Sequence, residues 1–372
     1  MRAIVVWAAL FATLPAGAEE IRVEVRRSVA AAVVGNADEV KEGEGGRPLG
    51  AGDGTLRLRA EGGQLFAGSR AVQPPLVLRT GAGPLLLDGH RLPGRLEVWA
   101  DASGLVVVNV LGLEDYVAAV VASEMPASWP AAALEAQAIA ARTFAMAQKI
   151  TIGAGARAHL GSTVLDQVYA GAAGQGAQAA AKATAGEVLT FGAMPIQAFF
   201  SASCGGFGEA GEVAFNLPAG ATPYLPGGDD GDADAAATSA RWTRSVPLAA
   251  ISSALRRAGR AKAEVVGVEV LDRTASGRAR TVRVKTARSA IDLPAAELRQ
   301  LIGYRELPSL LFTLELRQRS GGKEAAAIFT GRGSGHGAGL CQWGARGRAA
   351  RGESRAEILG HYYPGAEVRR MY

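Results

Sequence analysis

The sequence predicts an α+β protein with a β-rich N-terminal part, a helical centre and a second, mixed α/β lobe. Short alternating or β-branched runs, separated by Gly, Asp and Pro, fill residues 20–110 and indicate strands. The period then becomes helical from Leu113 to about Lys149. One helical run and several strand runs follow in residues 241–330. We expect a cleft between the lobes, because ligand sites are concave and often lie between structural units.

The period and composition divide the chain into segments. Residues 1–18 have the pattern of a secretory signal peptide, and residues 19–94 form the β-rich N-terminal region. Residues 95–372 form the main domain, within which 226–330 is expected to be a partly separate lobe. The strand runs of the N-terminal part are "IRVEVRRSV", "TLRLRA", "PLVLR", "GRLEVWA" and "GLVVVNVL".

The N-terminus predicts export. Arg2 precedes the apolar run "AIVVWAALFATL", and Ala16 and Ala18 form an A-x-A cleavage site, so we expect cleavage after Ala18. The alternative is a membrane anchor, although the run is short for a bilayer span. We expect no membrane span after cleavage. The net charge of +5, from 40 basic and 35 acidic residues, is a weak attraction to anionic surfaces such as a cell wall. No dense Lys/Arg patch indicates nucleic acid as a partner.

Two prolines divide the helical centre. Pro126 disfavours the helical conformation at Met125, so the first helix should end near Glu124. Ser128 is placed to cap the next helix, and Pro130 suits its first turn.

Glu124 is a candidate general acid. A carboxyl group at a helix C-terminus lies in negative dipole potential, and partial burial beside Met125 and Trp129 would add desolvation. Both effects raise the pKa of a carboxyl group. An acid that is protonated near neutral pH can protonate a glycosidic oxygen. The alternative, a surface glutamate at an ordinary helix–turn–helix, stays open at this point.

Three other parts of the sequence contain residue types that can take part in chemistry or ligand binding. The glycine-rich loop "GRGSGHGAGL" around His336 can approach an extended polar ligand closely, or can be a tight loop with a locally bonded histidine. Trp343 can stack on a sugar or belong to the core. Ser203 in "FFSASCGG" is not in a G-x-S-x-G nucleophile elbow. The stretch "GGDDGDADAAATS" lacks the later ligands of a calcium loop, so we interpret it as a solvated loop.

The cysteines and histidines suggest no metal centre. Cys204 and Cys341 form an even pair, which favours a disulfide in an exported protein, with two free thiols as the alternative. A metal would need further ligands, and the histidines are four: His90, His159, His336 and His361. We expect no cofactor.

An ordered set of motifs resembles the SpoIID/LytB family of bacterial cell-wall proteins. It spans roughly residues 95–370, and its segments are "LGLEDYVAAVVASEMPASWPAAALEAQAIAARTFAM", "DQVYAG", "FFSASCGG", "PYL" and "GRGSGHGAGLCQWGARGRAARGESRAEILGHYYPG". The resemblance implies a lytic transglycosylase that acts on peptidoglycan glycan strands. The glutamate of the family's "EMP" motif, here Glu124, is then the acid and base that cleaves the MurNAc–GlcNAc bond and leaves a 1,6-anhydro end. This reaction needs one carboxyl group rather than the pair of ordinary glycosidases.

The resemblance also implies roles for other side chains. Gln137 and Arg142 lie on the helix after Glu124 and are expected to order the site, with an ion pair to Glu135 as the alternative for Arg142. The remaining candidates for substrate contact are Tyr169, Ser203, His336 and Gln342.

The sequence also departs from the family pattern. Some relatives hold zinc with a histidine and two cysteines around the "SASCGG" segment, but Ser201 stands where many of them carry the histidine, so we expect no zinc. Cys341 stands where many relatives have serine. A disulfide between Cys204 and Cys341 would bring the loop of His336 towards the cleft.

Two other functions stay open. The family name also covers amidase enhancers, so a non-catalytic peptidoglycan-binding protein that assists a cell-wall amidase is the first alternative. A metal-dependent or serine hydrolase is the second.

Overall fold

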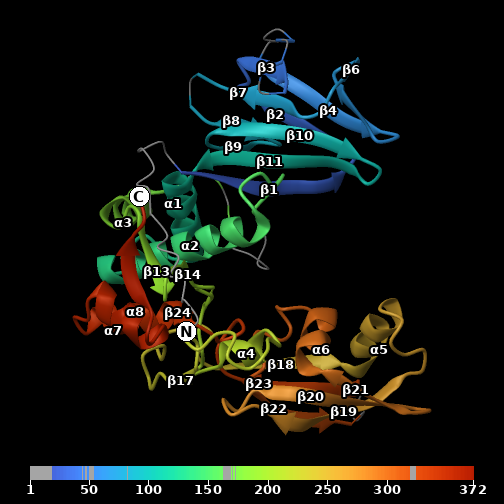
Figure 1. Ribbon diagram of the computed structural model, residues 1–372. Coiled ribbons are helices and arrows are strands. Elements are labelled where there is room, and N and C mark those ends of the chain that lie inside the picture. The colour runs from blue at the N-terminus through green and yellow to red at the C-terminus, as the bar shows by residue number, and fades with distance from the viewer. Residues whose placement is uncertain are drawn as a thin grey trace, which may run out of the picture.

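The computed structural model describes residues 19–43, 45, 46, 48, 49, 54–81, 83–161, 169, 171, 173–318 and 324–372. The predicted signal peptide lies outside these residues. Helices and strands are mixed along the chain, and the N-terminal part is built from strands, which confirms the predicted α+β class. Figure 1 shows the N-terminal sheets at the top, the helical centre below them and the second lobe at the lower right.

Among the described residues, two six-stranded sheets form the N-terminal part. The first has the order β12 (Leu160–Gly161), β1 (Glu20–Val29), β11 (Gly104–Gly112), β10 (Arg95–Asp101), β7 (Leu76–Arg79) and β3 (Glu39–Glu42). The second has the order β6 (Arg70–Val72), β5 (Gln64–Ala67), β4 (Thr55–Glu61), β2 (Ala31–Gly35), β8 (Leu85–Leu87) and β9 (His90–Leu92). Leu58 of β4 and Leu96 of β10 are fully buried in one shared hydrophobic cluster, so the two sheets have a common core.

Strand β11 is buried on both faces. Val107 and Leu111 belong to the main core, whereas Val106 and Val108 form a smaller cluster against Trp99. The two clusters lie on opposite faces because successive side chains of a strand point to opposite sides. Strand β11 ends at Gly112, beyond residue 94, where the sequence led us to end the β-rich region. It leads directly into the first helix.

The helical centre begins with α1 (Leu113–Glu124) and α2 (Ala131–Ile152). Met125 has φ −132° and ψ 138°, an extended conformation that precedes Pro126, so the predicted end of α1 at Glu124 is confirmed. The predicted cap of α2 is wrong. Pro130 is the N-cap residue, with no side-chain hydrogen bond, and Ser128 stays in the turn.

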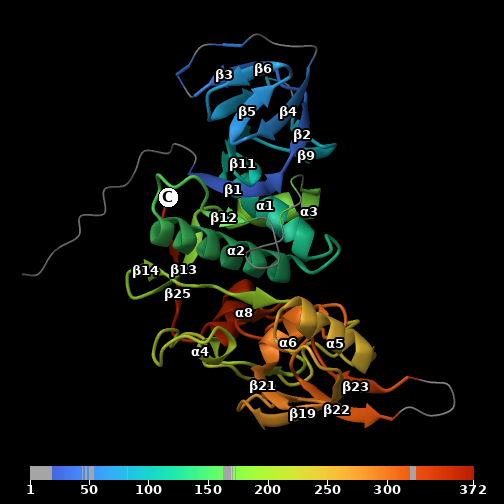
Figure 2. The ribbon, with the colours of Figure 1, turned by 90° about the vertical axis from the view of Figure 1, so that its right-hand side faces the viewer.

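Helix α2 is the central element of this region (Figure 2). It packs against α1 and against α3 (Gln175–Ala183), β13 (Glu187–Phe191), β14 (Met194–Pro195), α7 (Gln342–Ala350) and α8 (Arg355–Tyr362). Ala138 and Ala141 are fully buried, and such small side chains allow neighbouring helices to approach closely. Strand β25 (Glu367–Arg370) pairs with β13 and brings the C-terminal segment back to the centre.

The second lobe has its own hydrophobic core. Its elements are β18 (Trp242–Pro247), α5 (Leu248–Arg257), β19 (Val265–Arg273), β20 (Ala279–Thr286), β21 (Ala290–Pro294), α6 (Ala295–Ile302), β22 (Phe312–Arg317) and β23 (Ala326–Gly331). Short elements connect it to the centre: β15 (Phe200–Ser201), β16 (Phe207–Gly208), α4 (Gly211–Ala214), β17 (Gly228–Asp229) and β24 (Leu340–Cys341). Parallel pairing of β15 with β24 joins segments that flank the lobe in sequence.

Arg142 ties the helical centre together. Its side chain is fully buried, and the guanidinium group donates to both carboxylate oxygens of Glu114, at 2.8 and 2.5 Å. It also donates to the backbone carbonyl oxygens of Ala181 and Glu187, each at 3.1 Å. One side chain of α2 therefore holds α1, α3 and β13.

We predict that Glu114→Gln lowers the free energy of unfolding by about 3 kcal/mol at neutral pH, because it leaves a buried guanidinium without its counter-charge. Burial disfavours the Glu114 carboxylate, but hydrogen bonds from Arg142 and Tyr372 outweigh it and hold the pKa of Glu114 below 4.5. The stabilisation by this ion pair is complete above the ordinary pKa of a glutamate. It is lost as the pH falls through the lowered pKa of Glu114 in the folded protein. The wild type and the variant should therefore converge in acid, as measured by urea unfolding across pH.

The matched control is Glu135→Gln. Glu135 pairs at 3.0 Å with Arg355, whose side chain is 35% exposed, so its loss should cost at most about 1 kcal/mol. Equal stability of Glu114→Gln and wild type at neutral pH would contradict the assignment.

Candidate functional site

A hydrogen bond joins Glu124 to a distant helix. Gln342, the first residue of α7, donates from its side-chain Nε2 to Oε2 of Glu124 at 2.8 Å, across 218 residues of sequence. Glu124 is half-buried and Gln342 is 3% exposed. Two of the residues that the sequence singled out therefore lie together, at the C-terminal end of α1 and the N-terminal end of α7.

An aromatic pair lies next to both residues in sequence. Trp129, in the turn after Glu124, packs against Trp343, which follows Gln342, with ring centroids 4.8 Å apart and an angle of 62°. The guanidinium carbon of Arg346 lies 5.1 Å from the Trp343 centroid and 5.9 Å from that of Trp129. All three side chains are partly exposed. Sequence reasoning missed Arg346, although its spacing of three from Trp343 puts both on one helix face.

The glycine-rich loop holds His336 against two phenylalanines. Its ring centroid lies 4.9 Å from that of Phe215 and 6.3 Å from that of Phe199. The backbone N–H of Ala338 donates to its Nδ1 at 3.1 Å. Burial lowers the pKa of His336 to about 4, so the imidazole is neutral near pH 7. It can accept or donate a hydrogen bond but carries no charge there.

Three other predicted contact residues lie inside the protein. Tyr169 is 7% exposed and donates its hydroxyl to Asn109 at 2.6 Å. Ser203 is 1% exposed and donates to the carboxylate of Asp234 at 2.5 Å. Gln137 is fully buried, and neither atom of its amide has a hydrogen-bond partner among the described residues. The geometry of Ser203 is that of a bonded core hydroxyl rather than a nucleophile next to a histidine.

The alternative that paired Arg142 with Glu135 is wrong. Arg142 binds Glu114, which lies on the neighbouring helix, and Glu135 binds Arg355. These contacts favour a scaffold role for Arg142, because its guanidinium is turned away from solvent.

The two cysteines lie together in the interior as free thiols. Their sulfur atoms are within 4.8 Å of each other, and the backbone N–H of Cys204 lies 3.2 Å from Sγ of Cys341. The predicted disulfide between Cys204 and Cys341 would need the two sulfur atoms to lie close together, as they do here. The disulfide itself stays a prediction.

The interpretation of residues 227–239 as a solvated loop is wrong for two aspartates. Asp230 is 6% exposed and Asp234 is 4% exposed, whereas Asp232 between them faces solvent. Asp230 accepts hydrogen bonds from Tyr362 and Arg348, which belong to the last two helices of the chain. The polar composition could not reveal these long-range partners.

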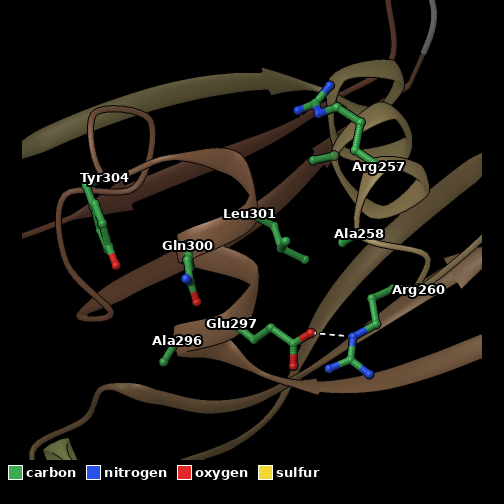
Figure 3. A pocket seen from close by; sticks show the side chains of 9 residues that line it. Arg257, Ala258, Arg260, Ala296, Glu297, Gln300, Leu301 and Tyr304 are labelled. Carbon is green, nitrogen blue, oxygen red and sulfur yellow. Dashed lines mark hydrogen bonds and ion pairs between the residues drawn. The ribbon is translucent and has the colours of Figure 1, made fainter. Parts of the chain in front are cut away.

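A separate open hollow of about 930 Å³ lies on α5 and α6 of the second lobe (Figure 3). Arg260 and Glu297 form an ion pair of 2.6 Å on one side, and Tyr304 stands on the other. Figure 1 shows these two helices at the lower right, well apart from α1.

Comparison with known proteins identifies the family. The family model described as "Stage II sporulation protein", SpoIID, matches residues 101–191, which include Glu124 and the whole of α2. A second model, described as "Domain of unknown function (DUF8618)", matches residues 229–339, the region of the second lobe.

Three relatives illustrate the likeness. An uncharacterized protein of Brachyspira hyodysenteriae is 32% identical over 76% of this chain and 73% of its own length. Stage II sporulation protein D of Bacillus amyloliquefaciens is 30% identical over 70% of this chain and 75% of its own. The amidase enhancer of Bacillus subtilis is 28% identical over 67% of this chain but only 39% of its own. The chain belongs to the SpoIID family. Within the described ranges, no helix has the length and apolar character needed to cross a membrane.

We predict that Gln137→Met leaves the free energy of unfolding unchanged or raises it by about 1 kcal/mol, since an unpaired buried amide is itself destabilising. The control on the same helix is Thr143→Val. The Thr143 hydroxyl donates to Ile139 at 2.6 Å and accepts from Leu189 at 2.8 Å, so this variant should lose about 1–2 kcal/mol. A larger loss for Gln137→Met than for Thr143→Val in urea unfolding would mean that the amide has a partner.

Proposed function

We propose that the chain is a lytic transglycosylase that cleaves the MurNAc–GlcNAc bond of peptidoglycan, with Glu124 as acid and base. The observation that carries the proposal is the half-buried carboxyl group at the end of α1, held by Gln342 beside a partly exposed aromatic pair. Family membership adds to it, because the matched region contains Glu124.

In the first step the protonated Glu124 gives its proton to the glycosidic oxygen, and the bond from that oxygen to the MurNAc C1 breaks. A carboxyl group at the C-terminal end of a helix lies in negative dipole potential, which disfavours its anion. The positive charge that develops at C1 is stabilised by the acetamido oxygen of the same sugar.

In the second step the Glu124 carboxylate removes the proton of the C6 hydroxyl, whose oxygen bonds to C1. The product is a 1,6-anhydro ring, no water is consumed, and Glu124 regains its proton. The Gln342 amide donates to Oε2 of Glu124 and so fixes the orientation of the carboxyl group that must move a proton twice. A single carboxyl group is enough for this sequence, whereas ordinary glycosidases use two.

Trp129, Trp343 and Arg346 are proposed to bind the glycan next to Glu124. An aromatic side chain offers an apolar face to a sugar ring. Arg346 offers a positive charge to carboxylates of the lactyl group or stem peptide. His336 would act from the glycine-rich loop, whereas the buried Gln137, Arg142, Tyr169 and Ser203 would support the site from inside the protein.

We further propose that the mature chain works outside the cytoplasm, in the periplasm or cell-wall space, because its N-terminal sequence has the signal-peptide pattern. The second candidate function is a peptidoglycan-binding protein that assists a cell-wall amidase. The name of the amidase enhancer relative favours this candidate.

We predict that Glu124→Gln loses formation of anhydro-muropeptides by at least about a hundredfold, because the amide cannot donate or accept the proton. Purified, peptide-free glycan strands are digested, and products are identified by mass spectrometry. Glu135→Gln, a glutamate on α2 outside the site, should retain wild-type turnover.

Full product formation by Glu124→Gln would remove the proposed mechanism. If wild type and Glu124→Gln both release nothing while both sediment with the strands, the amidase-enhancer function is favoured instead.

We predict that Trp343→Ala weakens sedimentation with glycan strands by about tenfold, through loss of the aromatic face. Arg346→Gln should weaken binding to both kinds of strand, because peptide-free strands carry lactyl carboxylates and the others carry stem-peptide carboxylates. Wild-type affinity of Trp343→Ala for both kinds of strand would argue that the pair only fills the core.

A further inference from the structure

Two cysteines and an aspartate meet in the interior from three distant segments. Cys204 follows β15, Asp234 lies after β17, and Cys341 ends β24. Their sulfur and carboxylate oxygen atoms all lie within 4.8 Å of one another. The residues are between 1% and 4% exposed. Sulfur and carboxylate groups in this arrangement are metal ligands.

A second aspartate lies next to this three-membered set. Oδ2 of Asp230 lies 3.2 Å from Sγ of Cys204, and Oδ2 of Asp234 lies 3.8 Å from the sulfur atoms of both Cys204 and Cys341. Zinc bonds of about 2.3 Å to sulfur and about 2.0–2.2 Å to oxygen put the corners of a tetrahedron about 3.5 Å apart. The spacing of Cys204, Cys341 and Asp234 therefore suits three corners of a tetrahedral zinc site.

Asp234 is a buried carboxyl group held by two hydrogen-bond donors. Its carboxylate accepts hydrogen bonds from the Ser203 hydroxyl and the Gly205 backbone, at 2.5 and 2.8 Å. No cationic side chain of the described residues lies within an ion-pair distance of it, whereas Asp230 pairs with Arg348 at 3.1 Å. A buried carboxylate without a counter-charge is strongly unfavourable. A divalent ion would supply the missing charge.

Backbone donors hold the sulfur atom of Cys341. Its sulfur accepts backbone N–H groups of Cys204 at 3.2 Å and of Gly344 at 3.3 Å, the latter in the first turn of α7. Cysteine binds a metal ion as the thiolate, so zinc binding would release the thiol protons.

The cluster has a neighbouring cavity, and further side chains contact Asp230 beside it. A small cavity of about 50 Å³, lined among others by Cys204, Asp230 and His361, reaches the cluster. The other carboxylate oxygen of Asp230 accepts from Arg348 and contacts Nε2 of His361, each at 3.1 Å. Contacts of this kind orient the ligands of metal sites.

We propose that Cys204, Cys341 and Asp234 hold a structural zinc ion, with Asp230, which contacts Cys204, beside the fourth position. Two thiolates and a carboxylate are ligand types suited to zinc, and burial in the interior suits a structural ion. The set differs from the histidine-and-two-cysteine set of some relatives, since only Cys204 lies in the "SASCGG" segment. The ion would fix the start of α7, whose first residue is Gln342. A zinc ion here would take the place of the disulfide and of the absence of a metal that we expected from the sequence.

The test is the metal content of the full mature chain, purified without chelators and measured by plasma mass spectrometry. We expect about one zinc per chain and two free thiols in the intact mass. After a chelator has removed the zinc, added Co²⁺ should produce a thiolate-to-cobalt charge-transfer band. It should also raise the melting temperature again. This titration uses the wild-type protein, so it stays informative if a variant fails to fold.

Cys341→Ser and Asp234→Asn should lower the zinc content at least about tenfold. The matched control is Asp232→Asn, the exposed aspartate of the same loop, which should keep all of it. Wild-type protein without zinc and without a cobalt–thiolate band would overturn the site. So would a disulfide between the two cysteines, or an equal loss of zinc in Asp232→Asn.

Discussion

The hydrogen bond from the Gln342 amide to the Glu124 carboxylate is the contact on which the site depends. It can form only if α7 reaches the end of α1, and α2 lies against both helices. The fully buried alanines of α2, such as Ala138 and Ala141, make this close packing possible. A run that looks like simple helix-forming sequence is therefore also a packing surface that brings two distant segments together.

Two rigid supports hold the partners of this contact. On one side β11 continues without a loop into α1, and Pro126 ends the helix, so the position of Glu124 follows from the N-terminal sheet. Arg142 fixes the same helix through Glu114. On the other side Cys341 and its carboxylate neighbours surround the start of α7. The second lobe lies between these two sides in sequence and has its own core.

Local features of the sequence predicted the α+β class, the end of α1 and the candidate acid. They did so because proline chemistry and hydrophobic period act within a few residues. The partner of Arg142, the burial of Asp230 and Asp234, and the contact of Gln342 with Glu124 depend on elements far apart in the chain. Composition suggested a solvated loop where the fold supplies Tyr362 and Arg348 as donors. The turn after α1 also escaped prediction, since Pro130 takes the capping position without a side-chain bond.

A crystal structure of the Glu124→Gln protein with a bound peptidoglycan fragment tests the central claim most directly. The account predicts that the oxygen between a MurNAc and a GlcNAc ring lies within about 3.2 Å of the residue 124 amide, with a sugar ring against Trp343. A fragment bound elsewhere, for example in the hollow of α5 and α6, with residue 124 untouched, would contradict it.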